Sequence, residues 1–450
     1  MTAPTTAPTA TSASPNELLH PSNITPVQWL ILLLGMVASM IEGFDIVVIS
    51  YTAPAITQDW GVSAEQMGLV LSSGVLGMTV GAMFLSWMAD RYGRRVMVSS
   101  TLVVAGVATS AVMFTSNPME LVVLRAIAGL ALGILVASLT PLMGEFSPLR
   151  HRILIVSILV AGASVGAMVG GLVTAAVIET HGWKVVFLYA GLITVVLGVI
   201  MQFAVPESIA FTMKRDPQRA LEKVNRTLKY IGQAAVQQLP AVSERESQES
   251  ASVVSLMTPA RRRATWLSWT AFFTGFVVVY FISSWMPQLL SNAGLPQEKA
   301  IQGTVAIPFG SIFGTMLMGW LSRWIPLNRL ITGGFVLGTV CICVMGMFAK
   351  DIGVIPFEIL LFMLFFVGIT LMGAFSNLYN VVMTIYPAQI RSTGLGWAAG
   401  LGRAGAVISP LLAGLLIGLG VSMPMLFVLF AVPGLIAALC VWVIRMRELP

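Results

Sequence analysis

The 450-residue chain is 57% hydrophobic and only 10% charged. Water-soluble domains average about 25% charged residues, so this composition excludes a soluble globular protein of this length. The apolar residues fall in blocks close to the ~20 residues that a helix needs to cross a bilayer. The net charge of +6 comes from basic clusters between these blocks, which argues against a nucleic-acid partner. The three cysteines lack the spacing of a disulfide framework or of metal ligands, and we expect no metal and no cofactor.

The chain begins with a stretch rich in Thr, Ala and Pro. Residues 1–27 contain no Lys or Arg, and they lack the basic region and short apolar core of a signal peptide. We interpret them as a disordered cytoplasmic tail.

Twelve apolar segments follow, each long enough to cross a membrane as a helix. Backbone polar groups in lipid must be satisfied internally, and these blocks are not the alternating ten-residue segments of a β-barrel. We therefore predict an all-α membrane protein with twelve transmembrane helices. The predicted spans are residues 28–50, 66–88, 95–115, 121–143, 153–177, 183–205, 265–290, 301–322, 330–349, 357–386, 393–418 and 422–444.

The basic residues predict the orientation of these spans. If both termini are cytoplasmic, twenty Lys and Arg fall on the cytoplasmic side and only Lys184, Lys299 and Lys350 on the other. A charged stretch then divides the spans into six plus six, as in transporters built from two similar halves. The predicted parts are an N-terminal half at 28–205, a cytoplasmic linker at 206–264, a C-terminal half at 265–444 and a cytoplasmic tail at 445–450. Within the linker, KRDPQRALEKVNRTLKYIGQ predicts a short amphipathic helix.

Two acidic residues interrupt the first span. Glu42 and Asp45 are three residues apart, which places both carboxylates on nearly the same face of a helix. Charges at membrane depth are costly and usually functional, and neighbouring acids raise each other's tendency to hold a proton. We predict that they carry a coupling proton, with Glu145 as the next candidate. The alternative is a structural pairing with Arg125.

The eleventh span carries an arginine near mid-membrane, Arg403, with no acid in the same helix. The planar guanidinium suits bidentate binding of a carboxylate, so we predict contact with an anionic substrate, and a structural ion pair is the alternative. For Arg125 in the fourth span, pairing with Asp45 and holding substrate both stay open. Trp285, near a span end, is predicted to be an interfacial anchor. Further substrate contacts are predicted from polar and aromatic side chains in the second half, namely Phe276, Tyr280, Tyr379, Asn380 and Trp397.

The loop after the second span reads SWMADRYGRRVMV at 86–98. An acid that pairs with an arginine or a helix N-terminus beside a tight glycine turn suits a short helix–helix connection. The pattern resembles the D-R-x-G-R-R loop of the major facilitator superfamily, although Ser86 replaces the leading glycine. The resemblance extends to LRAIAGLALG (124–133), VPES (205–208) and YPAQIRSTGLGWAAGLGRAG (386–405). It implies a gating role for Asp90, Arg91, Gly93, Arg94, Arg95 and Arg391.

The corresponding loop of the second half is degenerate. GWLSRWIPLNR (319–329) has Arg323 where the family has an aspartate. We therefore do not expect both halves to close in the same way.

The first span narrows the resemblance. IEGFDIVVISYTAPAI (41–56) resembles the D-G-[FY]-D signature of the aromatic acid:proton symporter branch, with Glu42 in place of the first aspartate. The residues that match the pattern of this branch are Glu42, Asp45, Arg125, Glu145 and Arg403. The resemblance implies import of a small organic carboxylate, expected to be aromatic, by proton symport through alternating access. We expect a monomer that is multi-pass in the lipid bilayer of the inner (cytoplasmic) membrane.

A proton-coupled efflux antiporter of drugs or metabolites is the alternative on the same fold. AGASVGAMVGG (161–171) resembles the glycine-rich fifth helix of such antiporters, but Ala167 stands where their proline follows the second glycine. GLGRAG (400–405) matches a nucleotide-binding fingerprint in letters only, because it lies inside an apolar helix rather than after a strand. The sequence offers no nucleophile–base pair, so we do not expect an enzyme.

Overall fold

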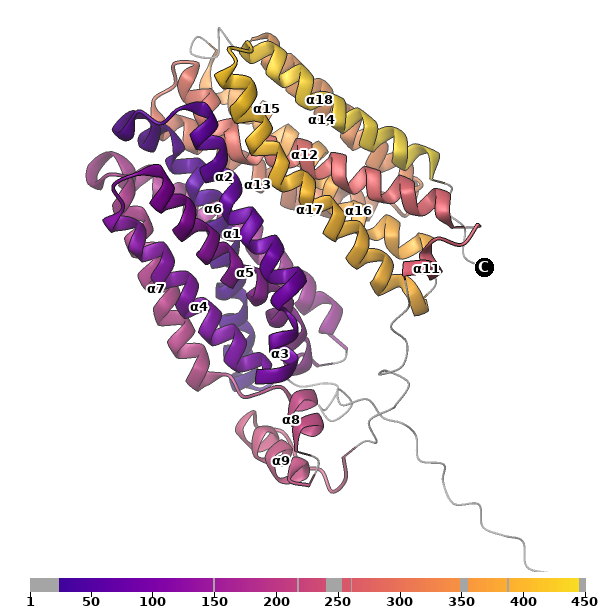
Figure 1. Ribbon diagram of the computed structural model, residues 1–450. Helices are drawn as coiled ribbons and strands as arrows, with labels where there is room; N and C mark the ends of the chain where they lie inside the picture. The colour runs from indigo at the N-terminus through magenta and orange to yellow at the C-terminus, as the bar shows by residue number, and fades with distance from the viewer. Residues whose placement is uncertain are drawn as a thin grey trace, which may run out of the picture.

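The computed structural model describes residues 24–148, 150–216, 218–239, 253–259, 261–348, 355–386 and 388–444. Twelve of the helices in these ranges are long and apolar enough to cross a membrane, which confirms the predicted all-α fold and the number of spans. An even number of spans brings the start of the first and the end of the last to the same end of the bundle. We call this the termini end and the opposite one the distal end (Figure 1).

The first six spans are formed by helices of the N-terminal half. Short helical segments with different hydrogen bonding, η2 and η3, complete the second and third spans. The elements are α1 (Pro26–Trp60), α2 (Ala64–Val80), η2 (Gly81–Leu85), α3 (Trp87–Tyr92), α4 (Arg94–Ala111), η3 (Val112–Phe114), α5 (Pro118–Phe146), α6 (Arg152–His181) and α7 (Trp183–Ala204).

The linker and the second half follow. Three short helices lie between the halves in the described part of the linker, and the tenth span is built from α15, η4 and α16. The elements are α8 (Ile209–Arg215), α9 (Ala220–Tyr230), α11 (Val253–Leu256), α12 (Arg262–Asn292), α13 (Gln297–Leu321), α14 (Leu327–Met347), α15 (Phe357–Val367), η4 (Gly368–Met372), α16 (Gly373–Ile385), α17 (Ala388–Gly418) and α18 (Met423–Val443).

The first helix extends ten residues beyond its predicted end at residue 50. It begins with a capping box in which the Thr25 hydroxyl accepts from the Gln28 N–H, and it ends at Gly61 in the left-handed conformation. Pro54 lies inside the helix and is buried. A proline removes one backbone hydrogen bond, and neighbouring helices tolerate this within a membrane bundle. The prediction was short because Pro54 and the polar residues after it lower the local hydropathy.

Close backbone contacts hold the helices of each half together. In the N-terminal half a Cβ on Gly43 would overlap the main chain of Ala163, and one on Gly166 would overlap the main chain of Met40. The small residues of the fifth span therefore let α6 touch α1 directly, as small residues do at membrane helix interfaces. These small residues pack α6 against α1, so they are explained without an antiporter function.

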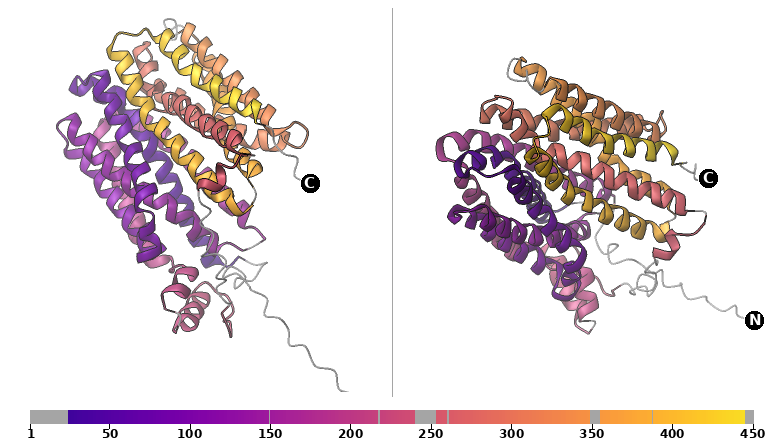
Figure 2. Two further views of the ribbon diagram at one scale, coloured as in Figure 1. Left: turned by 45° about the vertical axis from the view of Figure 1, so that its right-hand side comes forward. Right: turned by 45° about the horizontal axis from the view of Figure 1, so that its top comes forward.

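The two halves are joined near the distal end. Ser72 on α2 donates to the carbonyl of Val407 on α17 at 2.9 Å, and Gly68 packs against the backbone of Pro410. Thr57 on α1 lies 3.4 Å from the Gln288 amide oxygen on α12. The halves run side by side there and diverge towards the termini end (Figure 1, Figure 2). The helices of the two halves therefore lie farther apart at the termini end than at the distal end.

The described parts of the linker dock on separate halves. The Thr25 hydroxyl donates to the carbonyl of Ile231 at 2.6 Å, which ties the end of α9 to the start of α1. Helix α9 buries its apolar side, as its amphipathic sequence predicts. The Lys223 ammonium donates to the Asp216 carboxylate and lowers the pKa of that exposed acid. Near the C-terminal half, the Thr265 hydroxyl donates to the carbonyl of Leu256 on α11 at 2.9 Å.

Candidate transport site

A buried ion pair lies inside the N-terminal half. Arg125 donates through Nη1 to Asp45 Oδ1 at 2.8 Å and through Nη2 to Oδ2 at 2.9 Å, and Nη2 also reaches the Asp45 carbonyl at 2.6 Å. The Thr109 hydroxyl adds a bond to Oδ1 at 3.2 Å. Asp45 is 7% exposed and Arg125 is 2% exposed. Of the two roles left open for Arg125, the structure shows pairing with Asp45.

Little space remains beside this pair. The adjoining cavity measures about 10 Å³, which is no more than the room for one water molecule. Gly74 on α2 and Gly129 on α5 pack their backbones together beside it. In this conformation the Asp45–Arg125 pair has no room for an organic ligand.

Glu42 points to a different partner. Its side chain is half-buried and makes no hydrogen bond or salt bridge within the described residues, and the charge that acts on it most strongly is that of Arg403 on α17. Three residues on a helix are separated by about 60° around the axis. That angle directs Asp45 into the N-terminal half and Glu42 towards the C-terminal half, so the two acids share a region of α1 but not a set of partners.

Arg403 is the cation that faces Glu42 between the halves. It is half-buried, and its charge also acts on the hydroxyl groups of Tyr280 and Tyr379. No hydrogen bond or ion pair to Arg403 occurs among the described residues. The N–H donors of the guanidinium are therefore unused within the described residues, and Glu42 lies within range of its charge.

Aromatic rings form a wall beside Arg403. The Phe276 ring lies 4.7 Å from Phe375 and 5.8 Å from Tyr280, measured between centroids, and Phe272 lies 5.1 Å from Tyr379. Edge-to-face and tilted contacts of this kind fix ring positions. The predicted residues Phe276, Tyr280 and Tyr379 therefore come together with Arg403, and they offer ring faces and two phenol groups.

The remaining predicted contacts lie at the margins. Asn380 is exposed and donates to the Asn377 amide oxygen at 3.0 Å. Trp397 stacks on Trp269 at 6.0 Å and lines an apolar crevice of about 660 Å³ between α2 and α17, on another side of α17 from Arg403. The structure thus does not place Trp397 with the Arg403 group.

Trp285 is not the interfacial anchor that its sequence position predicts. It is 1% exposed and donates through Nε1 to the carbonyl of Pro410 at 3.1 Å. The prediction was wrong because helix α12 is buried between other helices up to its distal end.

Glu145 lies far from Glu42 and Asp45, at the termini end of α5. Twenty residues separate it from Arg125, or about 30 Å along the helix. It is 6% exposed, forms an ion pair with Arg94, and accepts from the Ser208 hydroxyl at 2.7 and 2.9 Å. The three predicted coupling acids therefore do not form one cluster, and Glu145 contacts the loop at 86–98 through Arg94.

The loop at 86–98 is arranged around a second acid that the motif does not contain. Glu207 Oε1 accepts from the backbone N–H of Arg95 at 2.9 Å, at the uncapped start of α4. Gly93 has a φ of 108°, and a Cβ there would lie 2.5 Å from Glu207 Oε2. Both the backbone conformation and the space above it require glycine.

The other loop residues have weaker roles. Asp90 is 73% exposed at its side chain and lies 4.0 Å from Arg94. Arg91 lies over the rings of Trp87 and Tyr92 at 6.0 and 5.8 Å. Arg391 donates to the carbonyl of Tyr386 at 3.3 Å.

Sequence reasoning missed Thr109, Glu207 and Ser208 as parts of these networks. The VPES segment was recognised as a boundary motif, and its acid next to a serine at a span end was the available signal. Thr109 gave no signal, because a lone threonine in a helix commonly bonds its own backbone. The described residues contain no group of three His, Cys, Asp or Glu side chains that could hold a metal ion.

Two six-helix bundles with charged and aromatic side chains facing one another between them define a polytopic membrane transporter. The Major Facilitator Superfamily model matches residues 35–356. The chain belongs to this family, and it is a transporter rather than an enzyme.

Relatives cover nearly the whole chain. It is 33% identical over 419 residues to a gallate transporter of Pseudomonas putida, covering 93% of this chain and 92% of that one. It is 30% identical over 438 residues to the 4-hydroxybenzoate transporter PcaK of Acinetobacter baylyi, covering 96% and 94%.

Two solved structures share the fold. A bacterial homologue of the human lysosomal transporter Spinster, in an inward-facing and occupied conformation, superimposes with a TM-score of 0.71 at 15% identity, covering 93% of this chain and 97% of the other. The xylose transporter XylE from E. coli in its inward-open conformation gives a TM-score of 0.70 at 17% identity, covering 94% and 97%.

Proposed function

We propose that this protein imports a small aromatic carboxylate together with a proton by alternating access. The observation that supports the proposal most directly is Arg403, a guanidinium beside Phe276, Tyr280 and Tyr379 that makes no hydrogen bond within the described residues. A carboxylate on a ring satisfies both the fork of the arginine and the aromatic wall. Several relatives are named as transporters of such acids, among them gallate, 4-hydroxybenzoate, benzoate and gentisate.

Glu42 is the proposed proton carrier at this site. When no substrate is bound, its carboxylate is the counter-ion of Arg403. A substrate carboxylate competes for that guanidinium, and a displaced Glu42 charge at membrane depth is costly unless it takes a proton. Binding of the anion and binding of the proton are therefore coupled. Asp45 keeps a cation of its own and acts as a structural support for α1 in this scheme.

In the proposed orientation the protein lies in the inner membrane, and its termini end faces the cytoplasm. The structure then represents the state that releases substrate inwards. Two variants, each with one added cysteine, test the orientation with an impermeant maleimide on intact cells, and the unmodified protein reports any labelling of its three native cysteines. A thiol introduced by Gln58→Cys at the distal end should be labelled, and one introduced by Glu222→Cys on α9 should be labelled only after lysis. Labelling of the α9 site in intact cells rejects the orientation.

Substrate class and coupling are tested together in proteoliposomes with a defined pH gradient. Labelled 4-hydroxybenzoate and gallate are compared with cyclohexanecarboxylate, which keeps the charge and size but has no aromatic ring. We expect accumulation of the aromatic acids when the outside is acidic, and loss of accumulation on adding an uncoupler. Expulsion of preloaded acid driven by the same gradient would instead support the efflux antiporter.

A further inference from the structure

Three glycines lie close together on α17, in the segment GLGRAG at 400–405. All three are inside the helix without a positive φ, so backbone conformation is not the reason for glycine. A Cβ on Gly400 would have only the terminal methyl carbon of Met83 near it, at 3.9 Å. One on Gly405 would lie 2.4 Å from the main-chain oxygen of Phe273. Gly405 therefore lets α17 pack closely on α12, whereas Gly400 has room for a side chain.

The middle glycine, Gly402, meets a side chain instead of a main chain. A Cβ there would lie 2.6 and 2.8 Å from Cδ2 and Cε2 of the Phe276 ring on α12. Carbon atoms in van der Waals contact are about 3.5–4.0 Å apart. The ring therefore occupies the space that any other residue at this position would fill. Gly402 is buried, and it directly precedes Arg403 in the chain.

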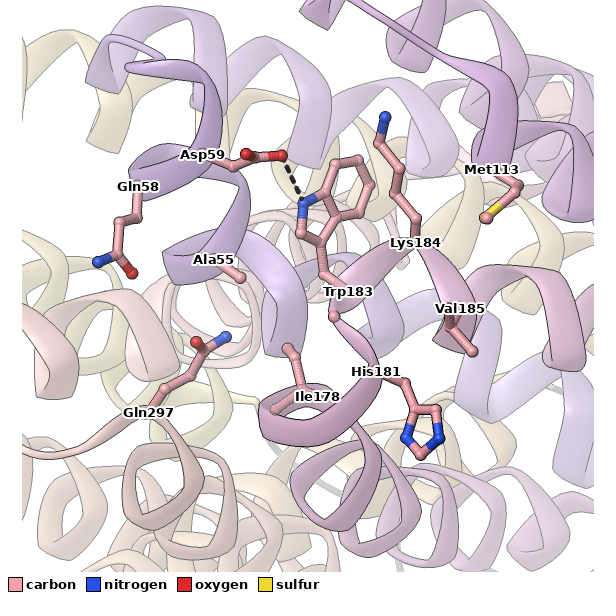
Figure 3. Close-up of a pocket in the computed structure, with 11 residues that line it drawn as sticks. Ala55, Gln58, Asp59, Met113, Ile178, His181, Trp183, Lys184, Val185 and Gln297 are labelled. Atoms are coloured by element: carbon pink, nitrogen blue, oxygen red, sulfur yellow. Dashed lines mark hydrogen bonds between the residues drawn. The ribbon is translucent and has the colours of Figure 1, made fainter.

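The Phe276 ring is held in its place by packing, because phenylalanine has no hydrogen-bonding group. An aromatic ring in the N-terminal half shows the other way of fixing such a group. The indole N–H of Trp183 donates to Asp59 Oδ2 at 3.1 Å, drawn as the dashed line in Figure 3. Without a bond of this kind, the position of the Phe276 ring follows the shape of its neighbours. The residue beneath it on α17 therefore decides how far the ring lies from that helix.

Phe276 borders the Arg403 site. Its ring lies 5.8 Å from Tyr280, whose hydroxyl is within range of the Arg403 charge, and 4.7 Å from Phe375 on α16. The Phe276 side chain projects from α12 onto α17. A ring displaced from α17 therefore moves towards these two aromatic neighbours, and the aromatic wall takes space from a ligand beside it.

We propose that Gly402 is a positioning residue that sets the size of the aromatic acid this protein accepts. It acts through Phe276. With no side chain beneath it, the ring lies back on α17, and the space left beside Arg403 admits an acid whose ring carries several substituents. The proposal rests on the proposed function, because it takes a carboxylate at Arg403 and a ring against Phe276 as given. It adds the residue that limits the substituents on that ring.

Equilibrium binding of benzoate, 4-hydroxybenzoate and gallate to the purified protein tests the proposal without transport. The three acids share the carboxylate and the ring, and they carry none, one and three ring hydroxyls. Gly402→Ala should weaken gallate binding about tenfold more than benzoate binding, since one carbon atom in a pocket changes affinity by roughly tenfold or more. Equal loss for all three acids, or no loss, overturns the proposal. Wild-type protein that binds benzoate but not gallate also overturns it, because the space is then not used.

Two further variants show whether the added methyl group acts through the ring. Gly400→Ala makes the same change on the same helix where there is room, so binding of all three acids should stay unchanged. Phe276→Leu removes the ring that the methyl group meets. In this background, adding Gly402→Ala should no longer change the ratio of gallate to benzoate affinity. A ratio that still changes contradicts an action through Phe276.

The yield of monodisperse protein separates substrate size from helix packing. Gly402→Ala should keep the wild-type yield, because the Phe276 side chain can move. Gly405→Ala should lower the yield, because the Phe273 carbonyl belongs to the main chain of α12. Equal losses of yield in these two variants make Gly402 a packing residue and overturn the proposal, while the proposed function stands. A wild-type protein that binds none of the three acids rejects the proposed function and this proposal with it.

Discussion

The two membrane arginines are in opposite situations. Arg125 in the N-terminal half makes two bonds to the Asp45 carboxylate and one to its carbonyl, and only 2% of it is exposed. Arg403 in the C-terminal half has no hydrogen bond within the described residues and is half-buried. Both residues are expensive in a membrane, yet only one is neutralised by its own half.

This difference indicates different roles for the two halves. Arg125 has its counter-ion within its own half and no room for an organic ligand beside it, so it stabilises the contact of α1 with α5. Arg403 faces the other half, where Glu42 is its counterpart. In the proposed cycle the C-terminal half therefore supplies the anion site and the N-terminal half supplies the proton.

The largest expected effect comes from breaking the buried Asp45–Arg125 ion pair. Asp45→Asn leaves the Arg125 charge buried without a counter-ion, and loss of one partner of a buried pair costs about 3–5 kcal/mol. We expect low yield of folded protein and no uptake. Adding Arg125→Gln should restore yield, because the buried charge is then removed with its partner. The measurement is monodisperse protein after purification; normal yield of Asp45→Asn alone contradicts a structural pair.

Substitution of Arg403 should give the reverse pattern, with substrate affinity lost and folding kept. Arg403→Lys retains the charge without the planar fork, and Arg403→Ala removes both. Losing a charge-assisted hydrogen bond costs about 1.5–3 kcal/mol, or roughly ten- to a hundredfold in substrate affinity. Binding of 4-hydroxybenzoate and protein yield are measured on the same preparations. Wild-type affinity in well-folded Arg403→Ala sinks the substrate role, and poor folding rescued by Glu42→Gln indicates an ion pair instead.

Glu42→Gln tests the proton side of the same site with a smaller structural change. The amide keeps the shape but cannot take up a proton, so the pH gradient should no longer drive accumulation. Exchange of internal for external substrate needs no net proton movement and should persist. Accumulation by Glu42→Gln that still follows the gradient places the coupling proton on another residue. Uptake driven by pH and exchange at zero gradient are compared in the same proteoliposomes.

The fold could be predicted from the sequence, because a bilayer allows few solutions. Apolar blocks of spanning length leave only helices, and the predicted number of spans matches the structure. The predicted helix boundaries were less accurate where a polar segment still forms helical hydrogen bonds. The distal end of α1 contains Pro54 and polar residues but remains helical to Trp60 because neighbouring helices bury it.

The charged residues of the candidate site could be predicted from the sequence, but which acid pairs with which arginine could not. A charge inside an apolar span is conspicuous in any sequence, so Glu42, Asp45 and Arg403 were found. Which acid meets which arginine depends on the rotation of α1 against two bundles, and residue spacing within one helix does not contain that information. Glu207 was missed for the same reason, since its partner at Arg95 is more than a hundred residues away.

The smallest predicted effect concerns the termini end, where the halves also differ. The N-terminal half is tied there by Arg94, Glu145, Ser208 and Glu207, while the corresponding loop of the other half carries the exposed Arg323. Glu207→Ala removes the acceptor for the Arg95 N–H in the first turn of α4, and loss of such a cap costs about 1 kcal/mol. Asp90→Ala, the matched control at an exposed acid of the same loop, should stay within about 0.5 kcal/mol. Thermal unfolding in one detergent compares the two variants. A larger loss for Asp90→Ala than for Glu207→Ala would show that the motif aspartate, and not the acid of VPES, holds this end of the N-terminal half together.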